Sequence, residues 1–240
     1  MYRSLDAVQI VATLHRLHAR IVERFASAGL ARVCADLVDV AEATATRVQA
    51  LARPYVALRL GVFGLLAAGV VAQIVAVQYI RIERIEADAP ALVEGLESAV
   101  NLLILFGGAV WFLVTMEQRL KRARVLKALH ELRSLAHVVD MHQLTKDPTL
   151  VLGRAGPTAS SPAREMSAFE LSRYLDYCAE MLALIGKLAA LYAERTGDGV
   201  VIDAVNDLES LATDLGRKIW QKIMIIGQLE ERRSTWSKPL

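Results

Sequence analysis

Two stretches of the chain are long enough and apolar enough to cross a membrane as helices. Residues 60–80 and 98–116 contain no charged side chain. A helix rises about 1.5 Å per residue, so about 20 residues reach the ~30 Å thickness of a bilayer core. The alternative, two buried core helices, is weaker because a chain of 240 residues could hardly cover both on all sides. The pattern predicts spans at 57–80 and 98–116, joined by a short external connector at 81–97.

Apolar residues recur every three or four positions in the segment before the first span. This spacing predicts one amphipathic helix over residues 4–27 and a second over 30–53. Ser4 is a candidate N-cap for the first helix, and Gly29 is a candidate for its end. We therefore expect residues 1–54 to form an N-terminal cytoplasmic helical hairpin.

The segment after the second span divides into three parts. Residues 117–146 contain no helix breaker and predict a cytoplasmic stalk that continues the span. Residues 147–162 hold three prolines and two glycines, which predicts a linker. Residues 163–240 predict a second cytoplasmic hairpin, with one helix to about Arg195 and a last helix over about 200–231.

The start of the first of these two helices carries its own signal. Ser167 and Glu170 have the spacing of a capping box, and Met166 and Leu171 that of a hydrophobic staple. The fold class we predict is all-α: a two-span transmembrane helical hairpin with cytoplasmic amphipathic helices on both sides. The four flanking helices should pack together into a bundle.

The charges beside the spans predict their orientation. The connector 81–97 holds two arginines against five acidic residues, whereas residues 117–127 hold five basic residues against one glutamate. Positive flanks stay on the cytoplasmic side, so both termini should be cytoplasmic. Abundant Ala, Val, Arg and Leu are typical of a high-GC bacterium, which places the protein in the bacterial inner membrane.

Composition narrows the function classes. Hydrophobic residues make up 54% and charged residues 22%, which fits a mixture of apolar spans and amphipathic helices. The net charge is +2, with no basic tract that would favour nucleic-acid binding. The two cysteines, Cys34 and Cys178, lie far apart, so neither a disulfide framework nor a structural zinc site is expected. Nucleotide-binding and hydrolase motifs are absent, and we expect no cofactor.

Histidines and polar residues supply the candidate chemistry. His15 and His18 stand three residues apart on one predicted helix, as do His137 and Asp140 on the stalk, and either pair could bind a metal ion or sense pH. The simpler interpretation is that these are interfacial side chains of amphipathic helices. The polar residues 140–148 could likewise line a site, although a helix terminus blocked by Pro148 explains them more simply.

The spans themselves contain amides and small residues. Gln73 and Asn101 should lie at similar depth, and amides in lipid favour hydrogen bonds between helices. The first span has a stripe of small residues formed by Gly61, Gly64 and Ala68. The second span has a small residue, Gly108, on the same face as Asn101. These groups could hold the two spans of one chain together, or join subunits, even around a pore.

No residue set identifies an enzyme, so the first hypothesis is a membrane-anchored helical scaffold or sensor that forms a homo-oligomer. Its partners would be the lipid bilayer, further copies of itself and an unidentified cytoplasmic protein, but not nucleic acid. The second hypothesis is a small oligomeric two-span channel or membrane-perturbing effector. The third is a metal-dependent enzyme at the membrane face.

Overall fold

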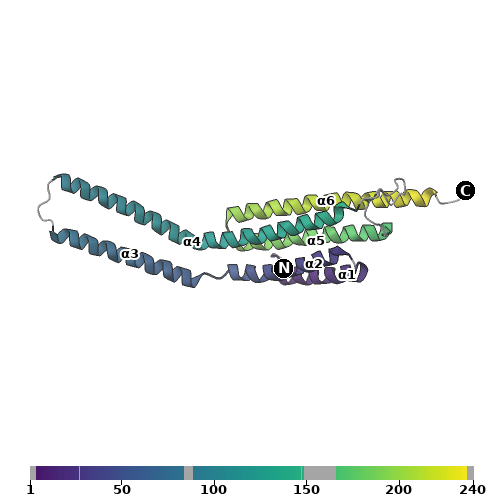
Figure 1. The fold of residues 1–240 in the computed structure, drawn as a ribbon, viewed down its shortest axis with the longest axis horizontal. Coiled ribbons are helices and arrows are strands. Elements are labelled where there is room, and N and C mark those ends of the chain that lie inside the picture. The colour runs from purple at the N-terminus through teal and green to yellow at the C-terminus, as the bar shows by residue number, and fades with distance from the viewer. Residues whose placement is uncertain (1–3, 27, 84–88, 147, 149–165, 237–240) are drawn as a thin grey trace. The chain divides into compact units, whose positions relative to one another are not determined.

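The computed structural model describes residues 4–26, 28–83, 89–146, 148 and 166–236. Their regular structure is helical, which confirms the all-α prediction. The helices in chain order are α1 (Ala7–Arg24), α2 (Gly29–Leu51), α3 (Val56–Glu83), α4 (Ala89–Leu144), α5 (Ala168–Arg195) and α6 (Gly199–Trp236) (Figure 1). The chain divides into two compact units, one formed by Met1–Ala52 with Arg124–Leu240 and the other by Arg53–Ala123.

The N-terminal helices begin and end at residues other than those expected. Asp6, not Ser4, caps α1, because its side chain accepts a hydrogen bond from the backbone N–H of Val8. Helix α1 ends at Arg24, where Phe25 is the C-cap and donates its N–H to the carbonyl of Ile21. Gly29 is the first residue of α2 and does not end α1.

The expected capping box is confirmed at the start of α5. The Ser167 hydroxyl accepts a hydrogen bond from the backbone N–H of Glu170, and the Glu170 carboxylate accepts one from the backbone N–H of Ser167 at 2.8 Å. Leu171 is buried, and Met166 packs against the core. The helix ends at Arg195, where the sequence pattern predicted its end.

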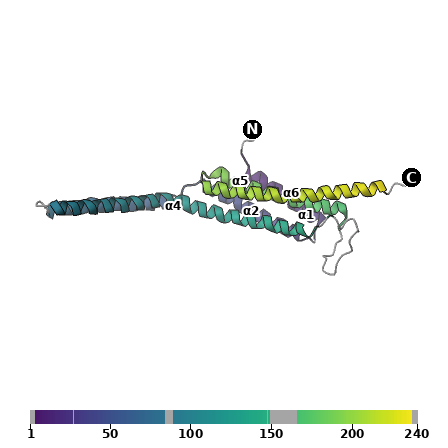
Figure 2. The same cartoon turned by 90° about the horizontal axis from the view of Figure 1, so that it is seen from above.

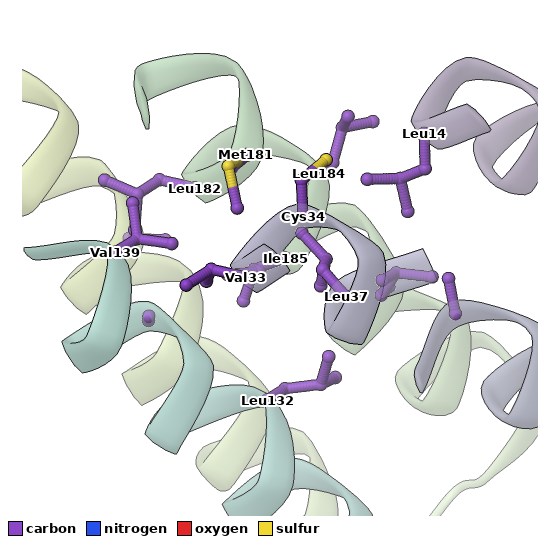
Figure 3. Close-up of a cluster of buried hydrophobic side chains, with 14 of the residues drawn as sticks. Leu14, Val33, Cys34, Leu37, Leu132, Val139, Met181, Leu182, Leu184 and Ile185 are labelled. Atoms are coloured by element: carbon purple, nitrogen blue, oxygen red, sulfur yellow. The ribbon is translucent and has the colours of Figure 1, made fainter. Parts of the chain in front are cut away.

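The first unit is a helical bundle with one apolar core. Its buried side chains come from α1, α2, α5, α6 and the part of α4 that follows Arg124. Figure 3 shows members of this core pointing toward one another, among them Leu14 of α1, Leu37 of α2, Leu132 of α4 and Ile185 of α5. Helices α5 and α6 run side by side, as both views show (Figures 1 and 2). The amphipathic stripes read from the sequence thus bury one another.

The second unit consists of α3 and the first part of α4. Helical stretches within Gly29–Ala72 and Leu103–Leu144 are long and apolar enough to cross a membrane by length and composition, and none of the apolar window of either is buried. Helix α4 runs without interruption from Ala89 to Leu144, so the second apolar stretch and the expected stalk form one helix. Residues 84–88 of the expected connector, and all but Pro148 of the expected linker, lie outside the described residues.

Candidate functional site

A group of polar side chains gathers inside the bundle where α4 ends. We call it the α4-end cluster, and its members come from α4, α5, α6 and the residues just after α4: Asp140, His142, Gln143, Lys146, Tyr174 and Lys222. Gln143 is its centre, because its side chain is only 2% exposed. The Lys222 ammonium donates hydrogen bonds to the backbone carbonyl of Gln143 at 2.8 Å and to its Oε1 at 2.6 Å.

The remaining polar groups of Gln143 are also bonded. Its Nε2 donates to Asp140 Oδ1 at 2.6 Å, and its backbone carbonyl accepts the N–H of Lys146 at 3.1 Å. The last carbonyls of a helix have no partner within the helix, and here a lysine from α6 serves one of them. This geometry agrees with the helix-terminus interpretation of residues 140–148.

His142 links the cluster to α2 and α5. Its Nδ1 lies 3.4 Å from the hydroxyl oxygen of Tyr174, at hydrogen-bonding distance. Its ring also packs on Gly29, where a Cβ atom would lie 2.8 Å from His142 Cε1. A side chain on residue 29 would require the imidazole to shift, so Gly29 makes room for His142 and does not end α1 as expected.

Burial favours the neutral form of three side chains at the cluster, those of His142, Tyr174 and Cys178. Burial, and then the Lys146 ammonium, lower the pKa of His142 below its ordinary value. Burial raises the pKa of Tyr174, and it raises the pKa of Cys178 to about 12. A protonated thiol is a poor nucleophile, so Cys178 acts as a packing residue. The contacts of the α4-end cluster therefore hold α4, α5 and α6 together.

Two further contacts join helices across the bundle. The Tyr192 hydroxyl on α5 donates to the Thr44 hydroxyl on α2 at 3.3 Å, and Arg47 on α2 pairs with Glu131 on α4 at 2.7 Å. Among the described residues, no buried side-chain nitrogen or oxygen lacks a hydrogen-bond partner. The bundle therefore satisfies its own polar groups.

The histidines proposed for a metal site lie on two different helices. His15 on α1 is exposed and its Nε2 lies 3.0 Å from Glu42 Oε1 on α2, while His18 is half-buried. On α4, His137 is exposed and Asp140 bonds Gln143. In the part of the chain that the structure describes, no three His, Cys, Asp or Glu side chains are grouped to hold a metal ion. A metal site at these pairs stays a prediction.

The small residues of the two apolar helices fall into two groups. A Cβ atom on Gly69 would lie 2.9 Å from Phe106 Cε2, so Gly69 makes room on α3 for the Phe106 ring of α4. A Cβ atom on Gly61, Gly64 or Gly108 would meet nothing within 4 Å.

The structure describes the side chains of Asn101 and Ala68, but not that of Gln73. Asn101 is exposed on α4 and Ala68 is exposed on α3. The exposed glycines and Asn101 thus lie on surface that the described part of the chain leaves open. Whether this surface contacts a second subunit stays a prediction.

Comparison of the chain with protein-family models, curated proteins and solved structures gives no match.

Sequence patterns missed the residues that tie the bundle together. Lys222 interrupts the apolar stripe of the last helix between Ile219 and Ile226, and this interruption is the one local signal of its role. Its partner Gln143 lies 79 positions away in the chain, so helical spacing could not reveal the pair. Tyr174 resembles any other apolar-face residue of α5.

Proposed function

We propose that this protein is a membrane-anchored helical scaffold or sensor. In this proposal α3 and the first part of α4 form a two-span hairpin, and the bundle lies in the cytoplasm. The observation that carries the proposal is the exposure of the apolar windows, since none of either window is buried. Side chains such as Phe63, Leu105 and Trp111 are 73%, 72% and 71% exposed.

Such a surface is costly in water. Each exposed Å² of apolar surface costs roughly 25 cal/mol, and monomeric soluble proteins rarely expose continuous apolar patches of this extent. The core helix of a soluble protein would bury its apolar window, and the bundle does bury its own. A lipid bilayer is the environment that removes the cost for the hairpin.

The flanking charges support an orientation with both termini in the cytoplasm. Basic residues follow the second apolar stretch at 117–127, and acidic residues predominate in the connector 81–97. Because basic flanks stay on the cytoplasmic side, the connector should face outward. In a bacterium this membrane would be the inner membrane.

Self-association is supported by the surface of the two apolar helices. Gly61, Gly64 and Gly108 have open space beside them, and small residues let helices from two chains approach closely. Asn101 is an exposed amide in the same region, and an amide in lipid gains from a hydrogen bond to another helix. A homo-oligomer would supply both contacts.

Two measurements test the membrane proposal. The protein should stay in the membrane pellet after an alkaline carbonate wash, whereas release into the wash would refute membrane insertion. In intact cells, a cysteine introduced as Asp88→Cys should react with an impermeant thiol reagent, and one introduced as Ser234→Cys should not. The reverse labelling would overturn the orientation. The native Cys34 and Cys178 are buried and should stay unlabelled.

A third measurement separates a scaffold from a channel. Purified protein in liposomes should show no sustained ion flux without a ligand. Reproducible flux that disappears in the double variant Gln73→Leu, Asn101→Leu, with oligomer size unchanged, would instead favour the channel hypothesis.

A further inference from the structure

A cavity of about 510 Å³ lies between α3 and α4, at the end of the apolar helices where the basic residues gather. One part of its wall is polar and is formed by Arg59, Glu117, Gln118 and Lys121. The rest is apolar, with side chains that include Val62, Leu66 and Leu113. Both wall types come from the same pair of helices.

Apart from Leu58, which precedes Arg59, the apolar wall lies beyond the polar wall along the helix axis. On α3, Arg59 precedes Val62 and Leu66, so the apolar side chains lie up to about 10 Å further along the helix. On α4, which runs back in the opposite direction, Lys121 follows Leu113. The cavity therefore has a charged end near the basic flanks and an apolar end toward the middle of the span.

The charged end is built around one carboxylate that holds two cations. Arg59 Nε donates to Glu117 Oε2 at 2.7 Å, and Lys121 Nζ lies 2.9 Å from Glu117 Oε1. The Glu117 side chain is 12% exposed and that of Lys121 is 24% exposed, whereas Arg59 is 65% exposed. Lys121 also lies over the Tyr55 ring, 5.2 Å from its centre.

The charges of these three residues leave a net charge of +1 at the cavity. A guanidinium has five N–H donors and an ammonium three, so one carboxylate does not use them all. Glu117 holds the two cations beside the cavity that both of them line, so a phosphate oxygen entering it would meet N–H groups that Glu117 does not use. This is the pattern of a basic pocket between spanning helices at the cytoplasmic side, which suits anionic lipid headgroups.

We propose that the cavity between α3 and α4 binds an anionic glycerophospholipid, with its phosphate at Arg59 and Lys121 and an acyl chain along Val62, Leu66 and Leu113. The proposal rests on the membrane insertion argued above. A free phosphate would fit the charged end but would leave the apolar wall uncovered. A zwitterionic lipid would fit the apolar wall, but the positive group of its headgroup would lie beside the positive charges of Arg59 and Lys121.

The test is native mass spectrometry of the full chain in a neutral detergent, with phosphatidylglycerol or phosphatidylcholine as the probe. Wild-type protein should bind one phosphatidylglycerol in preference to phosphatidylcholine. Arg59→Gln and Lys121→Gln should each weaken phosphatidylglycerol binding about fivefold or more. Inorganic phosphate in excess should not displace the lipid.

Arg119→Gln is the matched control, since it removes the same charge from the same turn region of α4, two residues before Lys121. Arg119 lies over the Phe112 ring and does not line the cavity, so its loss should change binding less than twofold. Val62→Trp should weaken binding without any change of charge, because it fills the apolar end. This variant separates a built site from general attraction at a basic surface.

The outcomes divide clearly. Equal losses for Arg59→Gln and Arg119→Gln would overturn the site in favour of diffuse surface attraction. Displacement by inorganic phosphate would overturn the lipid as the occupant, and equal binding of phosphatidylcholine would overturn its anionic character. Release of the protein by carbonate would refute membrane insertion itself, whereas retention together with any of these three results would refute the lipid site alone.

Discussion

The contact between Lys222 and Gln143 provides a sharp test of how the bundle is held together. Lys222→Met keeps most of the side-chain length and removes the ammonium. Gln143 is only 2% exposed, so its side-chain oxygen then loses its partner inside the bundle, and its backbone carbonyl keeps the N–H of Lys146. We expect the free energy of unfolding of the bundle to fall.

The size of the loss follows from these contacts. Hydrogen bonds to a charged group contribute about 1.5–3 kcal/mol, and an unpaired buried acceptor costs about 1–3 kcal/mol. Part of this is offset because the half-buried ammonium no longer has to leave water. A net loss of about 2 kcal/mol corresponds to a rise of about 30-fold in the population of the opened bundle.

The native cysteines supply the assay. Cys34 on α2 and Cys178 on α5 are both 0% exposed, and burial raises the pKa of each thiol to about 12. They become reactive only when the bundle opens, so their rate of thiol labelling in mild detergent measures bundle opening. Lys222→Met should raise this rate about 30-fold.

Two controls make the result decisive. Lys218→Met removes the same charge from an exposed position on α6 and should change the rate about twofold at most. In a Gln143→Leu background, Lys222→Met should cost less, and the difference measures the coupling of the pair. A wild-type rate in Lys222→Met, or an equal effect of Lys218→Met, would refute the reasoning.

Three other predictions follow from named contacts. Gly29→Ala places a Cβ atom 2.8 Å from the tip of the His142 imidazole, which can shift, so it should cost the bundle about 1 kcal/mol at most; in a His142→Ala background the same change should cost less. Because folding lowers the pKa of His142, the unfolded chain binds a proton at this residue at higher pH than the folded chain does, and the free energy of unfolding should fall as pH drops below about 6.5. His142→Gln should reduce this dependence of stability on pH, whereas the exposed control His130→Gln should leave it unchanged. Gly69→Leu should disrupt hairpin packing, whereas Gly61→Leu should preserve the hairpin and reduce crosslinked oligomers.

The sequence patterns that worked are local ones. The capping box at Ser167 and Glu170 fixed the start of α5, because both groups belong to the first turn of one helix. Apolar spacing of three and four positions gave the all-α class, since it depends on one helix at a time. The apolar stretches near 60–80 and 98–116 were recognisable for the same reason.

The predictions that failed needed information about distant residues. Ser4 is a good N-cap residue, but Asp6 is nearer the start of α1 and takes the role. Gly29 resembles a helix end, yet the space it leaves is occupied by His142 from another helix. Similarly, the small-residue stripe did not reveal that Gly69, rather than Gly61, packs against α4. Residue type shows that a position is small, and only the fold shows what fills the space.

Two amides on α4 differ in whether the chain itself supplies their hydrogen-bond partners, and the difference bears on the proposed homo-oligomer. Gln143 is buried and is bonded by both Lys222 and Asp140, so the bundle completes its own environment. Asn101 is exposed within an apolar stretch, and an amide left unpaired in hydrocarbon costs several kcal/mol. The open space beside Gly108, two turns along the same face, leaves room for a second helix to approach. Crosslinkers placed next to Asn101 should therefore capture a partner copy, whereas crosslinkers placed next to Gln143 should capture only the chain itself.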